Sequence, residues 1–256
     1  MATLAGRRSG VGREERFFLI SAVLMAVVLI GGFSLQLAMG RSSFRVPLYV
    51  HLHALIFFGW TTLYLLQVAL AATGSTGLHR RLGWLSVGWI PAMVVMGTYI
   101  TVASVRDGRT PFFFQPGYFL VLNPLSILVF AGLASAAIVM RRHTQWHRRL
   151  MFCAMTEILG PGFGRILPLP LLIPHAAWAV FAAIMLFPIA GIMRDMRLYG
   201  RVHPAWWWGT ATLIVAQVAI DLISFSPAGI ALYEMVTAGS RGAALAPLAF
   251  PPFPAG

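Results

Sequence analysis

The stretch FFLISAVLMAVVLIGGFSLQLAM, which occupies Phe17–Met39, decides the fold class of this chain. It contains no Asp, Glu, Lys or Arg, and an apolar helix of about 20 residues is long enough to cross the hydrocarbon core of a bilayer. A basic segment precedes it, as in a signal peptide, but the apolar run exceeds the roughly 7–15 residues of a cleavable signal core. We therefore interpret it as a retained membrane span.

Six further apolar segments of similar length follow. Backbone polar groups in hydrocarbon must be satisfied within their own segment, so each segment is expected to be helical. The sequence therefore predicts an all-α polytopic membrane bundle of seven transmembrane helices (17–226), between an N-terminal segment (1–16) and a C-terminal tail (227–256). The predicted spans are Phe17–Met39, Pro47–Ala72, Leu82–Val105, Gly117–Met140, Leu150–Ile173, Pro174–Met193 and Ala205–Ser226.

Composition agrees with this class and excludes others. The chain has 256 residues, of which 59% are hydrophobic and 10% charged, whereas soluble domains have about 45–50% apolar and about 25% charged residues. Its 19 basic residues are all arginines. Without a lysine there is no Schiff base, which excludes a retinal protein. The arginines lie between apolar runs, so we assign them to anionic lipid headgroups and expect no nucleic-acid partner.

The distribution of arginines also predicts orientation. If the N-terminus is cytoplasmic, most of the arginines in the short loops lie on the cytoplasmic side, as the positive-inside rule requires. Seven spans then place the C-terminus outside. We expect the bacterial inner (plasma) membrane as the location. The tail is predicted to hold a short interfacial helix within Pro227–Ser240 and a loosely ordered Pro/Ala-rich end.

The seven histidines fall into two layers in this topology. Haem b needs two imidazoles from facing helices at matched depth. His79 and His147 both open a His-Arg-Arg-Leu motif just before a predicted span, so they are the predicted inner pair. His53 and His175 form a less well matched outer pair. The alternative for each inner histidine is an interfacial or helix-capping role. The other histidines are His51 on the outer side and, on the inner side, His143 and His203, where His203 is a third candidate ligand and His143 could share one metal with His147.

Ionisable residues within the predicted spans are the second set of candidates, because such groups are costly in a membrane. Glu157 and Arg165 flank the sequence Ile-Leu-Gly-Pro-Gly-Phe-Gly, whose proline and glycines predict a broken helix. Asp221 lies toward the outer end of the seventh span and could pair with His53. These groups could line a substrate, ion or proton cavity. The alternative is a structural kink that encloses a Glu–Arg or Glu–His pair.

Four motifs carry a resemblance. They are His51-Leu-His53, Leu78-His-Arg-Arg-Leu-Gly83, Trp146-His-Arg-Arg-Leu-Met151 and Gly200-Arg-Val-His-Pro204. Over the second to seventh spans, the chain resembles a group of bacterial multi-pass membrane proteins that offers no activity to transfer. More distantly, the paired histidines are similar to those of small dihaem cytochromes b, which implies haem b. The chain departs from that pattern because its inner histidines lie at helix entrances.

Three functional hypotheses follow. The first is haem-linked electron transfer through His79 and His147, with His53 and His175 as a second pair. The second is a proton-coupled transporter whose cavity contains Glu157, Arg165 and Asp221. The third is a non-catalytic subunit or assembly factor that binds other membrane-protein subunits, which the absence of any recognisable soluble domain or phosphate-binding loop favours.

Overall fold

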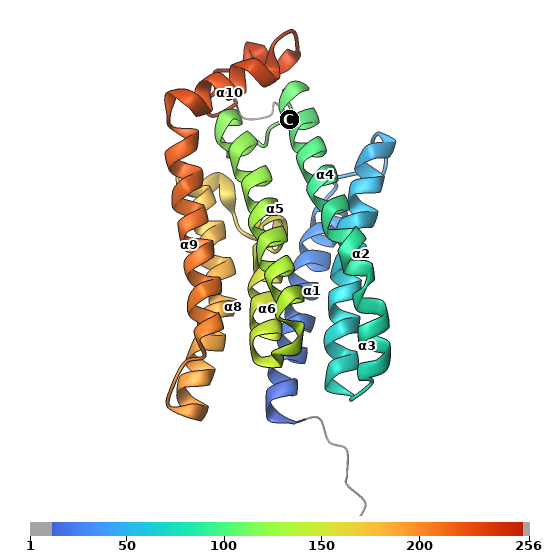
Figure 1. Ribbon diagram of the computed structural model, residues 1–256. Coiled ribbons are helices and arrows are strands. Elements are labelled where there is room, and N and C mark those ends of the chain that lie inside the picture. The colour runs from blue at the N-terminus through green and yellow to red at the C-terminus, as the bar shows by residue number, and fades with distance from the viewer. Residues whose placement is uncertain (1–11, 253–256) are drawn as a thin grey trace, which may run out of the picture.

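The computed structural model describes residues 12–252 and consists of helices joined by short connections, with no strand in that range. Most of the long helices run side by side along one axis, and α10 lies across one end (Figure 1). We call this the α10 end and the opposite end the α3 end. The elements are α1 (Arg13–Ala38), α2 (Leu48–Ala72), α3 (Thr76–Gly83), α4 (Leu85–Arg106), α5 (Pro116–Val139), η1 (Met140–Arg142), α6 (Thr144–Glu157), α7 (Gly160–Ile166), η2 (Leu169–Leu172), α8 (Ala176–Tyr199), α9 (Pro204–Ser224), α10 (Pro227–Thr237) and η3 (Arg241–Ala244).

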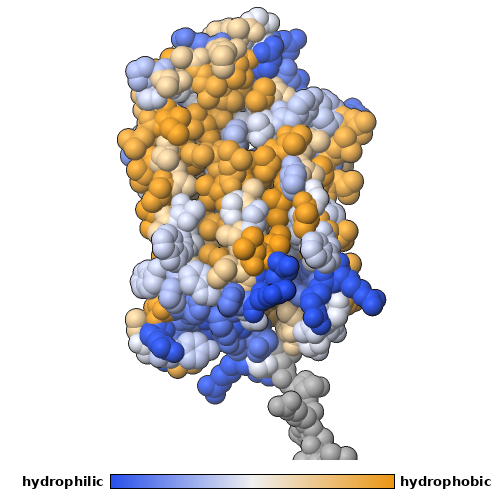
Figure 2. Space-filling view, in the orientation of Figure 1, coloured by the Kyte–Doolittle hydropathy of each residue, from blue (hydrophilic) through white to orange (hydrophobic). Residues whose placement is uncertain are grey.

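Six helices are long and apolar enough to cross a membrane: α1, α2, α4, α5, α8 and α9. Large apolar side chains point outward from them, including Leu55, Val95 and Leu222, each about 70% exposed. Figure 2 shows that such side chains form a broad apolar belt between more hydrophilic ends. Because water would disfavour a belt of this extent, the described chain has the surface of a multi-pass membrane protein.

The fifth predicted span, Leu150–Ile173, differs from the others because it is not one helix. α6 ends at Glu157, α7 begins at Gly160, and the short η2 follows. The break confirms the prediction made from the proline and glycines. Pro161 lies in the first turn of α7, where its missing N–H would have no helical partner in any case. Seven crossings thus remain a prediction, whereas six helices satisfy the length and hydropathy required of a single span.

Glycines explain why α7 can lie against α1. A Cβ atom on Gly32 of α1 would stand 2.6 Å from the carbonyl oxygen of Gly162 in α7. A Cβ on Gly162 would in turn stand 2.8 Å from the carbonyl oxygen of Val28. Neither distance is tolerable, so two glycines that face each other allow the backbones to touch, as small residues do at membrane helix interfaces.

α6 forms the centre of the bundle. Its side chains Phe152, Cys153 and Ala154 are completely buried, and α6 contacts α5, α8 and α9. On α9, Gly209 faces Cys153 so closely that any Cβ there would collide with the thiol. α6, which is buried at these positions, is not among the helices long and apolar enough to cross a membrane alone.

The C-terminal region closes the α10 end. The interfacial helix expected within Pro227–Ser240 is present as α10. Beyond it, the Pro247 carbonyl accepts a hydrogen bond from the Gly117 amide at 2.8 Å, and the Leu248 carbonyl accepts one from the Gln115 side chain at 2.7 Å. These bonds attach the tail to the start of α5, so the expectation of a loosely ordered end is wrong for this stretch. Residues 1–11 and 253–256 lie outside the described residues, and with them most of the predicted N-terminal segment.

Candidate functional site

The structure brings His79 and His147 together at the α3 end. His79 lies in α3 and His147 in the first turns of α6, and each is half-buried. Their ring centroids are 6.2 Å apart and their planes are inclined by 85°. These are the two histidines that the repeated His-Arg-Arg-Leu motif singles out. The motif places each histidine in the first turns of a helix, α3 or α6, that comes after a long helix. This shared position explains why the two histidines lie at the same depth.

Each of these rings is fixed through the same nitrogen. Nδ1 of His79 lies 3.1 Å from the carbonyl oxygen of Gln67 in α2, and Nδ1 of His147 lies 2.8 Å from that of Ala137 in α5. A carbonyl can only accept, so each Nδ1 carries a proton, and in a neutral ring Nε2 then holds the lone pair. Neither Nε2 has a hydrogen-bond partner within residues 12–252. Metal-ligating histidines commonly donate their other ring N–H to a backbone carbonyl in this way.

The other two inner histidines have different roles. His203 precedes α9, where its Nδ1 accepts a hydrogen bond from the Ala205 amide at 3.1 Å. His203 therefore caps a helix, which is one of the two alternatives that the sequence left open for it. His143 precedes α6 and is exposed. Within residues 12–252, no three His, Cys, Asp or Glu side chains gather as a metal site.

A buried ion pair at the same end was missed in the sequence. Arg149 of α6 and Asp195 of α8 are 2% and 1% exposed. Nη2 of Arg149 donates to both Asp195 oxygens at 2.9 and 3.0 Å, and Nε donates to Oδ2 at 3.1 Å. The indole of Trp206 in α9 donates to the same oxygen at 3.0 Å. Asp195 thus holds three helices together through one carboxylate.

Further charges surround this ion pair. Glu14 of α1 pairs with both Arg148 and Arg149, and Arg194 lies 3.5 Å from Asp195. From the sequence, these arginines were assigned to the ends of membrane spans. The sequence does not show that Arg149, one of two adjacent arginines, turns inward. Its partner Asp195 stands between Arg194 and Arg197, in a segment that resembles an ordinary basic helix end.

The predicted outer pair is not brought together. His53 lies in α2 near Arg165, and its ring is tilted against that of Phe57, with 4.3 Å between the centroids. Its buried Nδ1 has no hydrogen-bond partner within residues 12–252. Arg165 stands over the ring of Phe33 at 3.8 Å. His175 instead precedes α8 and is exposed. The two histidines thus have different surroundings.

The three intramembrane charges also lie apart from one another in their contacts. Glu157, at the end of α6, hydrogen-bonds Ser126 of α5. Arg165 donates to the carbonyl oxygen of Pro161 within α7 at 2.9 Å. No ion pair joins Glu157, Arg165 and Asp221 anywhere in residues 12–252, so the structure does not unite them in one charged cluster.

Asp221 has its own polar surroundings near the α10 end. Its carboxylate accepts hydrogen bonds from the Tyr118 hydroxyl at 2.8 Å, the Trp178 indole at 2.9 Å and the Gln217 amide at 3.4 Å. These donors come from α5, α8 and α9. Asp221, Tyr118, Trp178 and His175 line a cavity of about 230 Å³. The structure therefore joins two predicted candidates, His175 and Asp221, that the sequence had assigned to different sites.

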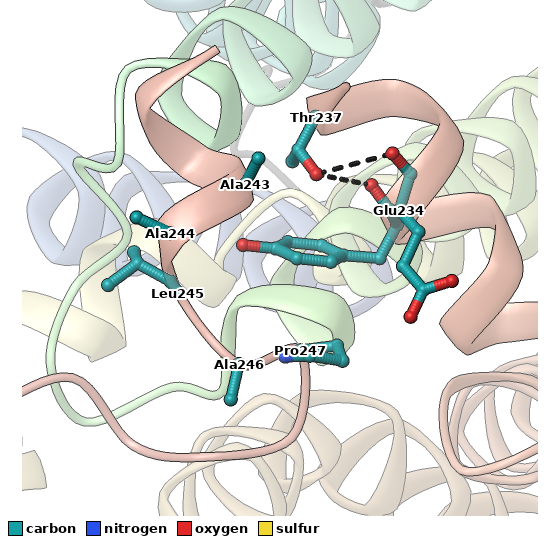
Figure 3. Close-up of a pocket in the computed structure, with 8 residues that line it drawn as sticks. Glu234, Thr237, Ala243, Ala244, Leu245, Ala246 and Pro247 are labelled. Carbon is teal, nitrogen blue, oxygen red and sulfur yellow. Dashed lines mark hydrogen bonds between the residues drawn. The ribbon is translucent and has the colours of Figure 1, made fainter. Parts of the chain in front are cut away.

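A second cavity, of about 270 Å³, lies between α10 and residues 243–247 (Figure 3). The Thr237 hydroxyl in its wall donates to the carbonyl oxygens of Tyr233 and Glu234, and the Tyr233 hydroxyl donates to that of Gly242. Alanines and a proline form much of the rest. These hydroxyl protons are already engaged, so this cavity offers no evident reactive set.

Comparison of the chain with protein-family models, with curated proteins and with solved structures finds no match.

Proposed function

We propose that the protein is a haem b protein of the bacterial inner membrane that transfers electrons, in which His79 and His147 would hold the iron of one haem. The observation that carries this proposal is the pair itself. Two histidines from separate helices lie 6.2 Å apart between ring centroids, and each directs its Nδ1 proton to a backbone carbonyl. Each ring thereby leaves Nε2 as a ligand.

The distance between the rings would allow both to hold one metal ion. With a metal–nitrogen bond of about 2.0 Å on each side, two imidazoles that share a metal ion can have centroids up to roughly 6.3 Å apart. The observed 6.2 Å lies within this limit.

The donor set also favours haem over a bare metal ion. A structural zinc site takes four protein ligands and a catalytic one takes three. Here only two donors meet, and no third His, Cys, Asp or Glu completes a group within the described chain. Haem would need only two donors from the protein, because the porphyrin supplies the other ligands of the iron. When bound, haem would supply a one-electron redox centre.

The contacts and charges around His79 and His147 favour haem binding. The carbonyl groups of Gln67 and Ala137 fix the orientation of the rings and increase the basicity of Nε2. Arg80 and Arg81, which follow His79, provide positive charge on this side of the bundle, whereas Arg148 and Arg149, which follow His147, are paired with Glu14 and Asp195. Such charge would favour the haem propionates as well as anionic lipid headgroups.

The proposal is limited to one haem. His53 lies beside Arg165, and His175 lines the cavity of Asp221, so we do not assign them a second haem. We infer seven crossings, with α6 and α7 together as the broken fifth, a cytoplasmic N-terminus and an outer C-terminus. Electron transfer also requires a redox partner, for which other membrane-protein subunits are the proposed class.

The test is a dithionite-reduced minus oxidised visible spectrum of the purified protein, expressed with added haem precursor. We expect a b-type α band that is lost in His79→Ala and in His147→Ala. His143→Ala is the matched control, because this exposed histidine lies four residues from His147 and should leave the band unchanged. An unchanged band in both ligand variants would contradict the assignment. A flat spectrum from folded wild-type protein would remove haem and favour a non-catalytic subunit or a transporter.

A further inference from the structure

The cavity beside Asp221 combines a carboxylate with an unusually aromatic wall. It lies near the α10 end, where the starts of α5 and α8, the end of α9 and the C-terminal tail meet. Six aromatic residues contribute to its lining: Phe113, Phe114, Tyr118, Trp178, Phe225 and Phe250. These residues come from five separate stretches of the chain, so the fold assembles this wall.

The Asp221 carboxylate has no cationic partner in the described part of the chain. All three of its hydrogen-bond donors are neutral groups, namely a phenol, an indole and a carboxamide. It forms no ion pair with any arginine or histidine in residues 12–252. Charges at this depth are normally paired. The neutral donors hold the carboxylate in a fixed position and leave its charge available to a ligand.

The aromatic wall indicates the type of ligand. The faces of aromatic rings attract cations through the ring quadrupole. Rings placed around one carboxylate form the arrangement that recognises ammonium groups in proteins. A bare metal ion would need several oxygen ligands, and only one carboxylate is present.

We propose that this cavity binds an organic ammonium group. Its volume of about 230 Å³ is below the roughly 300–1,000 Å³ of sites for drug-sized molecules. The ligand is therefore a small headgroup, either the ammonium of a zwitterionic lipid or a free amine of similar size. This proposal does not depend on haem binding at the other end of the bundle.

The first experiment compares a cation with a neutral molecule of the same shape. Delipidated protein in non-ionic detergent is titrated with choline and with 3,3-dimethylbutan-1-ol, in which carbon replaces the nitrogen, and binding is followed by calorimetry and by tryptophan fluorescence. We expect choline to bind at least about tenfold more tightly, because only choline gains the cation–π and carboxylate interactions. Equal affinity for the two molecules would overturn the proposal.

The second experiment tests the carboxylate. Asp221→Asn removes the charge and keeps the size of the side chain, and it should weaken choline binding by about tenfold or more. Trp178→Leu removes one ring and should also weaken binding. Glu234→Gln, in the wall of the other cavity, is the matched control and should bind choline as the wild type does. Unchanged choline binding in Asp221→Asn and Trp178→Leu, both folded by circular dichroism, would overturn the proposal.

The third experiment distinguishes the two sources of the ligand. Lipids that copurify with the wild type and with Asp221→Asn are extracted and quantified by mass spectrometry. Enrichment of phosphatidylethanolamine on the wild type alone identifies a lipid headgroup, whereas choline binding without such enrichment identifies a free amine. If the wild type shows neither enrichment nor choline binding, the proposal is wrong.

Discussion

Asp195 and Asp221 are two carboxylates at opposite ends of the pair formed by α8 and α9, and they differ in whether a charged group pairs with them. Both accept an indole N–H, from Trp206 and Trp178 respectively. Asp195 also accepts a bidentate pair of bonds from Arg149 and is 1% exposed. Asp221 receives its other bonds from neutral groups and borders a cavity.

This difference separates a structural charge from an available one. The charge of Asp195 is compensated inside the bundle, since Arg149 pairs with it. The Asp221 carboxylate is held in position but has no ion-pair partner within residues 12–252. A carboxylate within the bundle therefore points to a ligand when the protein leaves it without a counter-ion and with space beside it.

The largest expected effect on stability comes from breaking the ion pair between Arg149 and Asp195. Asp195→Ala leaves the buried Arg149 with only its longer 3.4 Å ion-pair contact to Glu14, and removal of one member of a buried pair costs about 3–5 kcal/mol. The free energy of unfolding, measured by SDS titration in mixed micelles, should fall by this amount. The double variant Arg149→Met with Asp195→Leu removes both charges and should recover much of the loss. A double variant as unstable as Asp195→Ala would contradict this view of the pair.

A smaller effect is expected from moving the indole that holds Asp195. Gly191 of α8 faces the ring of Trp206, and a Cβ there would collide with it. Gly191→Ala should displace the indole, weaken its bond to Asp195 and destabilise the protein by roughly 1–3 kcal/mol, as overpacking does. Gly31→Ala, where a Cβ would meet open space, is the matched control and should leave the unfolding midpoint unchanged or raise it.

Asp221→Asn should destabilise the protein by about 1 kcal/mol, because the amide oxygen can still accept from Tyr118 and Gln217 and only the bond from Trp178 is lost. Asp195→Asn should cost clearly more, since it leaves the buried guanidinium of Arg149 with only the 3.4 Å ion-pair contact to Glu14. The comparison is made by SDS titration of both variants. Equal losses of stability in the two variants would contradict the view that Asp195 stabilises the fold more than Asp221 does.

Much of this architecture could be predicted from the sequence. Six of the seven predicted spans correspond to helices of sufficient length and hydropathy, because hydrocarbon permits almost no other structure for long apolar runs. The broken helix followed from Pro161 and its neighbouring glycines. The proximity of His79 and His147 followed from two copies of one motif at the same depth.

The rest depends on packing between helices, which local sequence does not encode. The pairing of Arg149 with Asp195 depends on the rotation of α6 against α8, and the two residues are 46 positions apart. The cavity at Asp221 requires the tail to fold back onto α5. Asp221 was predicted as a site residue from its depth alone, but its aromatic surroundings come from five separate stretches.

The smallest expected effect concerns His203, which caps α9 and also contacts Asp195. Its Nδ1 accepts from the Ala205 amide, and its own amide donates to Asp195 at 3.4 Å. Burial, and next the charge of Arg149, lower the pKa of His203 below its ordinary value. The neutral ring is thus the folded form, so this contribution is complete above the unfolded pKa of about 6.5 and is lost as the pH falls below it.

His203→Asn tests this contribution, because asparagine is a good helix cap without a charge change in this range. Thermal unfolding is measured at pH 7.5 and at pH 5.5 for the wild type and the variant. On acidification, the wild type should lose more free energy of unfolding than His203→Asn does. The difference between the two losses should be about 1 kcal/mol or less, since a helix cap contributes about that much. His203→Ala should resemble the acidified wild type at both pH values. If the wild type and His203→Asn have equal pH dependence, the ring does not act as a cap through its neutral form.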